Sequence, residues 1–287
     1  MRYPDLNNFL RTNQLAKAKG PIGLIFVEDL IEVDSTIRHH LDQGFAEIIL
    51  FAPIELNLPR DLTESLTRVD YNYTKTKAHE QINMVIKAAP GSWIYYCYNA
   101  EYLFFPFCET RSIKDMTTFL SEERRDSALC YVIDLYADDL AKFETGVRRD
   151  RAMMDKSGYY ALARPDPVTD VHRDRQLDFF GGLRWRFEEH VSVSKRRIDR
   201  VGVFRAVAGL EITEDHRFNI QEYNTYACEW HNNLTAAICS FRTAKALKLN
   251  PGSTFEIDDF QWHGSTQFKW DSQQLMDLGL MEPGQWF

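Results

Sequence analysis

The sequence predicts an α/β fold with a mostly parallel sheet flanked by helices. Short apolar runs of strand length alternate with stretches in which apolar residues recur at helical spacing. A strand, helix, strand order of this kind implies parallel strands joined by right-handed crossovers. The alternation extends over residues 21–137 and predicts at least four strands there.

The first crossover comprises two strands and the helix between them. Residues 22–27 form an apolar run typical of a buried strand, and it ends in acidic residues. Apolar residues at helical spacing follow, with Asp34 a candidate N-cap and Gly44 a candidate helix end. Residues 47–51 are the second strand, stopped by Pro53.

The same alternation continues towards residue 137. A weaker strand over 68–73 precedes a helix over 75–89. Residues 93–103 then read as a buried strand of aromatic and β-branched residues that runs out into a polar turn. A helix capped by Ser112 and a strand over 128–133 complete the pattern.

The polar end of the 93–103 strand is the first candidate site. Ligands of open α/β sheets bind outside the carboxyl ends of the strands. Asn99 and Glu101 would then stand at the mouth of a site. The alternative is that Glu101 is an ordinary solvated residue at a strand end.

The second half of the chain departs from the alternation. Residues 138–180 are rich in charge, and we interpret them as a long and mobile loop. From Arg184 to Arg205, seven basic residues stand against three acids, a local excess of four positive charges. Such an excess suits a small polyanion such as a diphosphate, although an exposed basic face would look the same.

Towards the C-terminus the sequence predicts one more helix. Its apolar face would carry Leu234, Ala237, Ile238, Phe241, Ala244 and Leu247. Asn233 would cap this helix, and His231 would lie just before it as a neutral imidazole. We expect the aromatic tail from Trp262 onwards to pack back on the protein.

Composition excludes several functional classes. A net charge of −8 over 287 residues argues against general nucleic-acid binding. No apolar run is long enough for a membrane span, and the N-terminus lacks the apolar core of a signal peptide. The five cysteines form no Cys-x-x-Cys pair, which favours reduced thiols. We therefore expect a cytoplasmic protein.

Four segments in order carry a family resemblance. The first contains His-His-Leu-x-x-Gly-Phe, the second is the aromatic strand, the third begins Gly-Gly-x-Arg, and the last holds two late histidines. The residues are Ile37–Phe45, Trp93–Leu103, Gly181–Arg186 with Lys195 after it, and His216 with His231. Through them the chain resembles bacterial family-2-like glycosyltransferases of the GT-A fold, whose metal motif is embedded in Trp-x-x-x-x-Asp-x-Asp-Glu-Phe.

The resemblance implies a nucleotide-sugar donor, a glycan or other hydroxyl acceptor, and a role in surface polysaccharide synthesis. It implies a nucleotide-sugar-binding half over 1–137 and an acceptor-side half with a C-terminal extension over 138–287, together one continuous domain. Family members hold Mn²⁺ or Mg²⁺ against the diphosphate, where the ion offsets charge on the leaving group.

The motif is degenerate in this chain. The two motif aspartates fall on Tyr98 and Ala100, and the following acid survives as Glu101. The family also has an acid after the second strand, and that position is Ala52 here. The family's acid after the first strand is retained as Asp29. Either protein cations replace the metal, or catalysis is lost.

Roles follow from the resemblance residue by residue. Asp29 would hold the nucleoside, and Glu101 with His231 would be what remains of a metal or sugar site. The diphosphate would be bound by Arg184, Arg186 and Lys195. The base that takes the acceptor proton would be Asp215, with Glu188 and Glu189 as further candidates.

Two alternatives stay open. The first is a binding module of the same fold, which binds a nucleotide, glycan or protein partner without turnover. The second is a metal-dependent hydrolase built from His216, His231, Asp215 and Glu229, whose spacing matches no known ligand pattern.

Overall fold

The computed structural model describes residues 1–166, 168–225 and 233–286. The chain divides into two compact units that are interleaved in sequence. The first unit comprises Met1–Tyr102, Thr110–Leu129 and Val201–Asn224. The second comprises Leu103–Glu109, Cys130–Arg200 and Thr225–Phe287. Each unit therefore contains segments from both of the halves expected from the sequence.

The first unit holds the alternating α/β pattern. Its helices and strands are β1 (Arg2–Tyr3), α1 (Leu6–Leu10), β2 (Ile22–Phe26), α2 (Val33–Asp42), β3 (Glu47–Ala52), α3 (Arg60–Ser65), β4 (Thr67–Asp70), α4 (Ala78–Ala88), β5 (Trp93–Tyr98) and α5 (Ile113–Glu122). Three strands run from one unit into the other, namely β6 (Glu101–Phe104), β7 (Ser127–Tyr136) and β11 (Asp199–Arg205).

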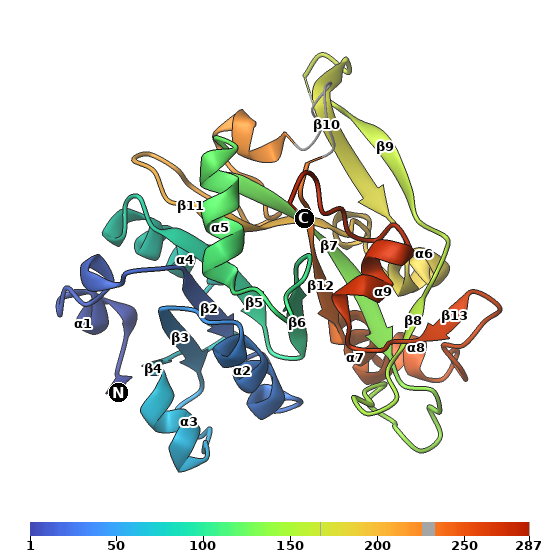
Figure 1. Cartoon of the computed structure of the whole chain (residues 1–287). Coiled ribbons are helices and arrows are strands. Elements are labelled where there is room, and N and C mark those ends of the chain that lie inside the picture. The colour runs from blue at the N-terminus through green and yellow to red at the C-terminus, as the bar shows by residue number, and fades with distance from the viewer. Residues whose placement is uncertain (167, 226–232, 287) are drawn as a thin grey trace. The chain divides into compact units, whose positions relative to one another are not determined.

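The sheet of the first unit confirms the predicted fold class. Its strand order is β1-β4-β3-β2-β5-β11, and every pair is parallel except β5 with β11. Helices flank this sheet (Figure 1). All five residues of β2 and all six of β5 are buried, as expected for strands covered on both faces. Phe26 pairs in register with Tyr98, so β2 and β5 end side by side.

The local signals for two helices were mostly correct. Ser112 caps α5 in a full capping box with Asp115, as predicted. Gly44 follows α2 with φ +81°, the left-handed conformation that ends many helices. Asp34 is not the cap of α2, however, because the helix begins at Val33 and Glu32 takes the cap position.

The 93–103 segment is two strands rather than one. Strand β5 ends at Tyr98, a turn at Asn99 and Ala100 follows, and β6 begins at Glu101. Ala100 has φ +61°, a left-handed conformation that breaks the extended backbone between the two strands. Glu101 therefore starts a buried strand and does not lie in an exposed turn.

The second unit is built on antiparallel and short elements. They are β8 (Met153–Asp155), β9 (Tyr160–Pro165), β10 (His172–Phe180), α6 (Leu183–Arg186), β12 (Ala236–Ser240), α7 (Arg242–Leu249), α8 (Pro251–Thr254), β13 (Ser265–Gln267) and α9 (Ser272–Asp277). Strand β12 is parallel to β7, whereas β8 is antiparallel to both β7 and β13. A buried cluster that includes Tyr136, Leu183 and Phe260 forms its core.

The prediction of a loop over 138–180 was wrong. The segment contains β8 and the antiparallel hairpin of β9 and β10. Most residues of the hairpin are exposed or half-buried, so its sequence lacks the apolar alternation that marks a strand packed on a core.

The predicted helix over 234–247 was wrong in its first part. Residues Ala236–Ser240 form β12, and α7 begins only at Arg242. All five residues of β12 are buried, and an apolar run of this length fits a buried strand as well as a helix. Asn233 therefore does not cap α7, whose cap position is Phe241.

The aromatic tail is packed into the second unit, as predicted. Phe268 and Met281 are buried, and the Trp262 indole donates a hydrogen bond to Asp155. No helix in the described part of the chain is long and apolar enough to cross a membrane.

Candidate functional site

Asn99 joins the ends of two neighbouring parallel strands in the first unit. Its side chain is fully buried. The side-chain oxygen accepts from the Glu28 backbone N–H at 2.8 Å. The side-chain amide donates to Asp29 Oδ1 at 2.7 Å and to the Ile31 carbonyl at 2.8 Å. One buried amide thus holds the loop after β2 against the end of β5, at the carboxyl edge of the sheet.

Asp29 is fixed in place by this network. Its Oδ1 also accepts from the Ile31 backbone N–H at 2.9 Å. Two neutral donors therefore orient the carboxylate, and the side chain remains half-buried. A carboxylate set by backbone and amide groups at this edge can accept from ligand N–H or hydroxyl groups.

Glu32 is a second carboxylate held by neutral donors near this loop. It has φ +56°, an uncommon conformation for a residue that is not glycine. Its Oε2 accepts from the hydroxyls of Ser35 and Tyr102. No sequence signal pointed to this group, because Tyr102 and Ser35 are far apart along the chain.

Glu101 lies in the interior, with its carboxylate against the backbone of its own turn. Its side chain is fully buried, and Oε2 accepts from the Tyr98 backbone N–H at 2.9 Å. The two motif positions beside it carry Tyr98 and Ala100, which supply no carboxylate. Within residues 1–166, 168–225 and 233–286, no group of three His, Cys, Asp or Glu side chains could hold a metal ion. The other predicted ligand, His231, lies outside the described residues.

His40 of the family-like His-His pair is a structural histidine. It is buried, and its Nδ1 contacts the Thr36 carbonyl at 2.7 Å. Burial lowers the pKa of His40 to about 3, with its neighbour His39 adding to the effect. The ring is therefore neutral near neutral pH and packs against Tyr95.

Arg184 is directed towards acceptors inside the second unit. Its Nε donates to Thr243 Oγ1 at 3.0 Å, and its NH1 donates to the Arg197 carbonyl at 2.7 Å. The same Nε lies 3.4 Å from Asp134 Oδ1. Asp134 is fully buried, and burial raises its pKa although Arg184 opposes the rise.

Arg186 holds a second buried carboxylate. Its Nε and NH2 donate to the two oxygens of Asp155 at 2.9 and 3.2 Å. Asp155 also accepts from the Tyr136 hydroxyl at 2.6 Å and from the Trp262 indole at 2.8 Å. In this arrangement Arg184 and Arg186 compensate buried acids, and their binding of a diphosphate stays a prediction.

The local excess of positive charge is largely compensated by acids from elsewhere in the sequence. Besides Asp134 and Asp155, the partners include Asp126 for Arg205 and Asp178 for Arg197. Counting charges within one window cannot find partners that folding brings in. Lys195 differs, because it is exposed at the end of a short helical turn over Val193–Lys195.

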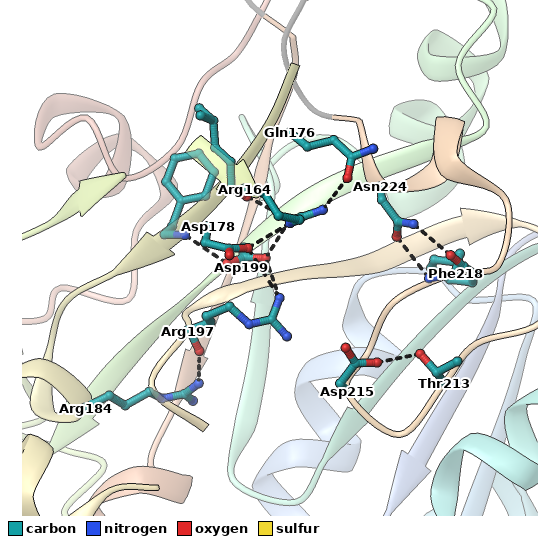
Figure 2. A network of polar contacts seen from close by, with 12 residues as sticks. Arg164, Gln176, Asp178, Arg184, Arg197, Asp199, Thr213, Asp215, Phe218 and Asn224 are labelled. Carbon is teal, nitrogen blue, oxygen red and sulfur yellow. Dashed lines mark hydrogen bonds and ion pairs between the residues drawn. The ribbon is translucent and has the colours of Figure 1, made fainter. Parts of the chain in front are cut away.

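Arg164 lies at the centre of a further buried network, shown in Figure 2. It donates to Asp178 Oδ1 at 2.9 Å and to Gln176 Oε1 at 2.8 Å. Asp199 lies 3.6 Å from Arg164 and 3.4 Å from Arg197. Burial raises the pKa of Asp199 to about 6, and the neighbouring Asp178 adds to this rise.

The candidate bases lie in exposed positions. Asp215 is exposed on a turn in the first unit and accepts from the Thr213 hydroxyl (Figure 2). Glu188 pairs with Arg196 at 3.0 Å, and Glu189 is 62% exposed at the side chain. These carboxylates are accessible to solvent, and the role of a base stays a prediction for each.

The hydrolase alternative gains no support from the described residues. His216 Nδ1 is 3.0 Å from the Tyr96 hydroxyl, and the two rings are stacked. Its neighbour Asp215 is bound to Thr213. His231 and Glu229 lie outside the described residues.

A pocket of about 340 Å³ opens at the opposite, amino edge of the first unit's sheet. Its lining includes Gly20, Ser92 and Lys114. None of the site residues predicted from the sequence lines it. We therefore take the Asn99 edge, where predicted site residues converge, as the candidate site.

Sequence reasoning missed the buried acids of the second unit. Asp134 directly follows the apolar run over 128–133, so the rule that found Asn99 would also have found Asp134. Asp155 had no such signal, because β8 is short and was not predicted.

No protein-family model matches the chain, and no curated protein matches it. Among solved structures, the chain is similar to S. aureus TarS 1–349, with 14% sequence identity and a TM-score of 0.32. That match covers 71% of this chain and 55% of the TarS chain. A likeness at this level decides nothing about activity, so the function is inferred from the residues.

Proposed function

We propose that the chain is a glycosyltransferase-like protein that binds a nucleotide-sugar at the carboxyl edge defined by Asn99 and Asp29. The observation that carries the proposal is the buried Asn99 amide, which joins the loop after β2 to the end of β5. Open α/β sheets bind ligands at such an edge. The four segments of the family resemblance supply the substrate class.

Asp29 would accept from the nucleoside, through an N–H of the base or the hydroxyls of the ribose. Two neutral donors orient its carboxylate, whose oxygens can accept from such groups. A carboxylate repels a phosphate, so the diphosphate would lie away from it. Lys195 is the exposed member of the three cations predicted to bind the diphosphate.

In the proposed transfer, the acceptor hydroxyl oxygen forms a bond to the anomeric carbon. The bond from that carbon to the diphosphate oxygen breaks, and the nucleoside diphosphate leaves with the electron pair. A carboxylate base, for which Asp215, Glu188 and Glu189 are candidates, takes the hydroxyl proton. The motif positions before Glu101 carry Tyr98 and Ala100, which supply no carboxylate to hold a metal ion, so no step is assigned to one.

A binding module without turnover is the second candidate function. The observation that favours it is the loss of the motif acids at Tyr98 and Ala100, with Glu101 turned onto the backbone of its own turn. A transferase must stabilise charge on the leaving diphosphate, and these substitutions remove the usual means.

The two candidates are separated by measuring release of the nucleoside diphosphate. The full chain would be incubated with UDP-, GDP-, dTDP- and ADP-sugars, with and without oligosaccharide acceptors, and the products separated by anion-exchange chromatography. Release that is lost in Asp29→Asn, but retained in the exposed control Glu64→Gln, supports the transferase. Binding without release supports the module, and neither binding nor release overturns both.

A further inference from the structure

The outer edge of the β9–β10 hairpin is an open pairing edge. Strand β9 pairs antiparallel with β10, and no other strand in the described part of the chain pairs with β9. Residues Tyr160–Ala163 are all exposed. A two-stranded hairpin is only marginally stable alone, and an exposed edge is a template for another strand.

The hydrogen bonds of β10 show which backbone groups of β9 point outward. The Phe179 backbone N–H donates to Asp199 Oδ1 at 2.9 Å, and the Phe179 carbonyl accepts from the Ile198 N–H at 2.8 Å. Both groups therefore point away from β9. Phe179 faces Ala161 in the register, so these two form a non-hydrogen-bonded pair. The pattern repeats every second residue. Ala161 and Ala163 therefore point their N–H and C=O groups outward, away from β10.

The first four residues of this edge lack the features that usually prevent pairing. Strand β10 has a register irregularity between His172 and Leu177 and carries several charged residues. In contrast, Tyr160–Ala163 contains no charge and no proline, and the protected part of β9 is confined to Arg164 and Pro165 at its end. Leu162 stands in its centre and is 55% exposed. Natural proteins protect exposed edges, so an unprotected apolar edge suggests a partner.

We propose that β9 of a second copy of this chain occupies the edge, antiparallel, with a two-fold axis through Leu162. In this register Ala161 lies opposite Ala163 of the second copy, and each such pair exchanges two backbone hydrogen bonds. Leu162 meets its own copy on the axis, where the side chains are closest. The outward groups are symmetric about Leu162 and no charge repels, so the segment is complementary to itself.

Sedimentation velocity of the full chain over increasing concentration tests this proposal. The expected mass rises from 33.6 kDa towards twice that value. Leu162→Asp places two carboxylates on the axis and should leave a monomer. Val168→Asp adds the same charge at an 89% exposed position in the turn of the same hairpin, and should still dimerise. A wild-type chain that stays monomeric at its solubility limit overturns the proposal and leaves the edge for a strand of another protein.

Ala163→Pro provides an independent variant. Its N–H points away from β10, so proline removes an intermolecular donor while the hairpin ladder stays intact. Loss of the dimer with an unchanged urea unfolding midpoint is the expected result. A dimer that persists in Ala163→Pro, or that survives Leu162→Asp, contradicts the register. The test reads oligomeric state alone and is independent of the proposed nucleotide binding.

Discussion

The two units use carboxylates in different ways. In the first unit, Asp29, Glu32 and Glu101 accept from amides, hydroxyls and backbone N–H groups. In the second unit, buried carboxylates such as Asp134 and Asp155 are held by arginines. In both units these acids lie near strand ends, and in the second unit arginines hold them.

This difference separates a ligand site from a structural network. A carboxylate oriented by neutral donors keeps its charge for a ligand, as Asp29 would for a nucleoside. A buried ion pair is already neutral, and removing one partner leaves an uncompensated charge in a medium of low polarity. We therefore expect changes in the second unit to affect folding first, and changes at the Asn99 edge to affect binding as well.

The largest effect is expected from Asp155→Ala. The change leaves the Arg186 guanidinium buried without its carboxylate and removes the acceptor of Tyr136 and Trp262. Breaking a buried pair of this kind costs about 3–5 kcal/mol in free energy of unfolding. Urea denaturation measures it. The control is Asp174→Ala, an exposed partner of Arg175, which should change stability by less than about 0.5 kcal/mol.

A pH dependence of roughly 3 kcal/mol is expected from Asp199. Burial raises its pKa from 3.8 to about 6, so between these values the folded chain binds the proton more tightly than the unfolded chain. Its contribution to stability therefore falls as pH rises from about 4 to about 6. The difference in free energy of unfolding between wild type and Asp199→Asn, measured across this range, should show that fall. A difference that is constant with pH would show that Asp199 does not cause the pH dependence of stability.

Asn99→Asp should cost about 2 kcal/mol and abolish nucleotide binding. The variant places an oxygen against Asp29 Oδ1 and the Ile31 carbonyl, where the wild-type amide donates. Asn72→Asp is the matched control, because Asn72 uses only its side-chain oxygen to accept from Thr74. Urea denaturation and calorimetry on both variants measure the two effects. Equal behaviour of the two variants would show that Asn99 does not organise the edge.

The smallest effect is expected from Lys195→Ala. An exposed cation contributes about 1 kcal/mol or less to binding an anion, and salt screens it. The affinity for a nucleoside diphosphate should fall a few-fold at low salt and less at high salt. Lys269→Ala, another exposed lysine of the second unit, is the control. Equal losses in both variants would mean a general charge effect.

The first unit was predictable because its signals are local. The buried strands ending at Phe26 and Tyr98 are continuous apolar runs, and Ser112 and Gly44 mark helix ends in the expected way. The sequence also pointed to Asn99, since polar residues directly after a buried strand lie at the carboxyl edge of the sheet.

The second unit was less predictable because its partners are distant in sequence. Arg186, for example, is paired with Asp155, which lies on a separate strand far from it in the sequence. The hairpin strands lack apolar alternation, and β12 is apolar throughout, so periodicity misassigned both. Glu101 reads as an exposed motif acid, but the turn at Ala100 carries it into a second buried strand.

The measurement that tests the central claim most directly is a calorimetric titration of the chain with nucleoside diphosphates. It would be run with manganese and with chelator, on wild type and Asp29→Asn. We expect binding that persists in chelator and is lost in Asp29→Asn. Binding that strictly requires manganese, or that is unchanged in Asp29→Asn, would contradict a nucleotide site organised by Asn99 and Asp29.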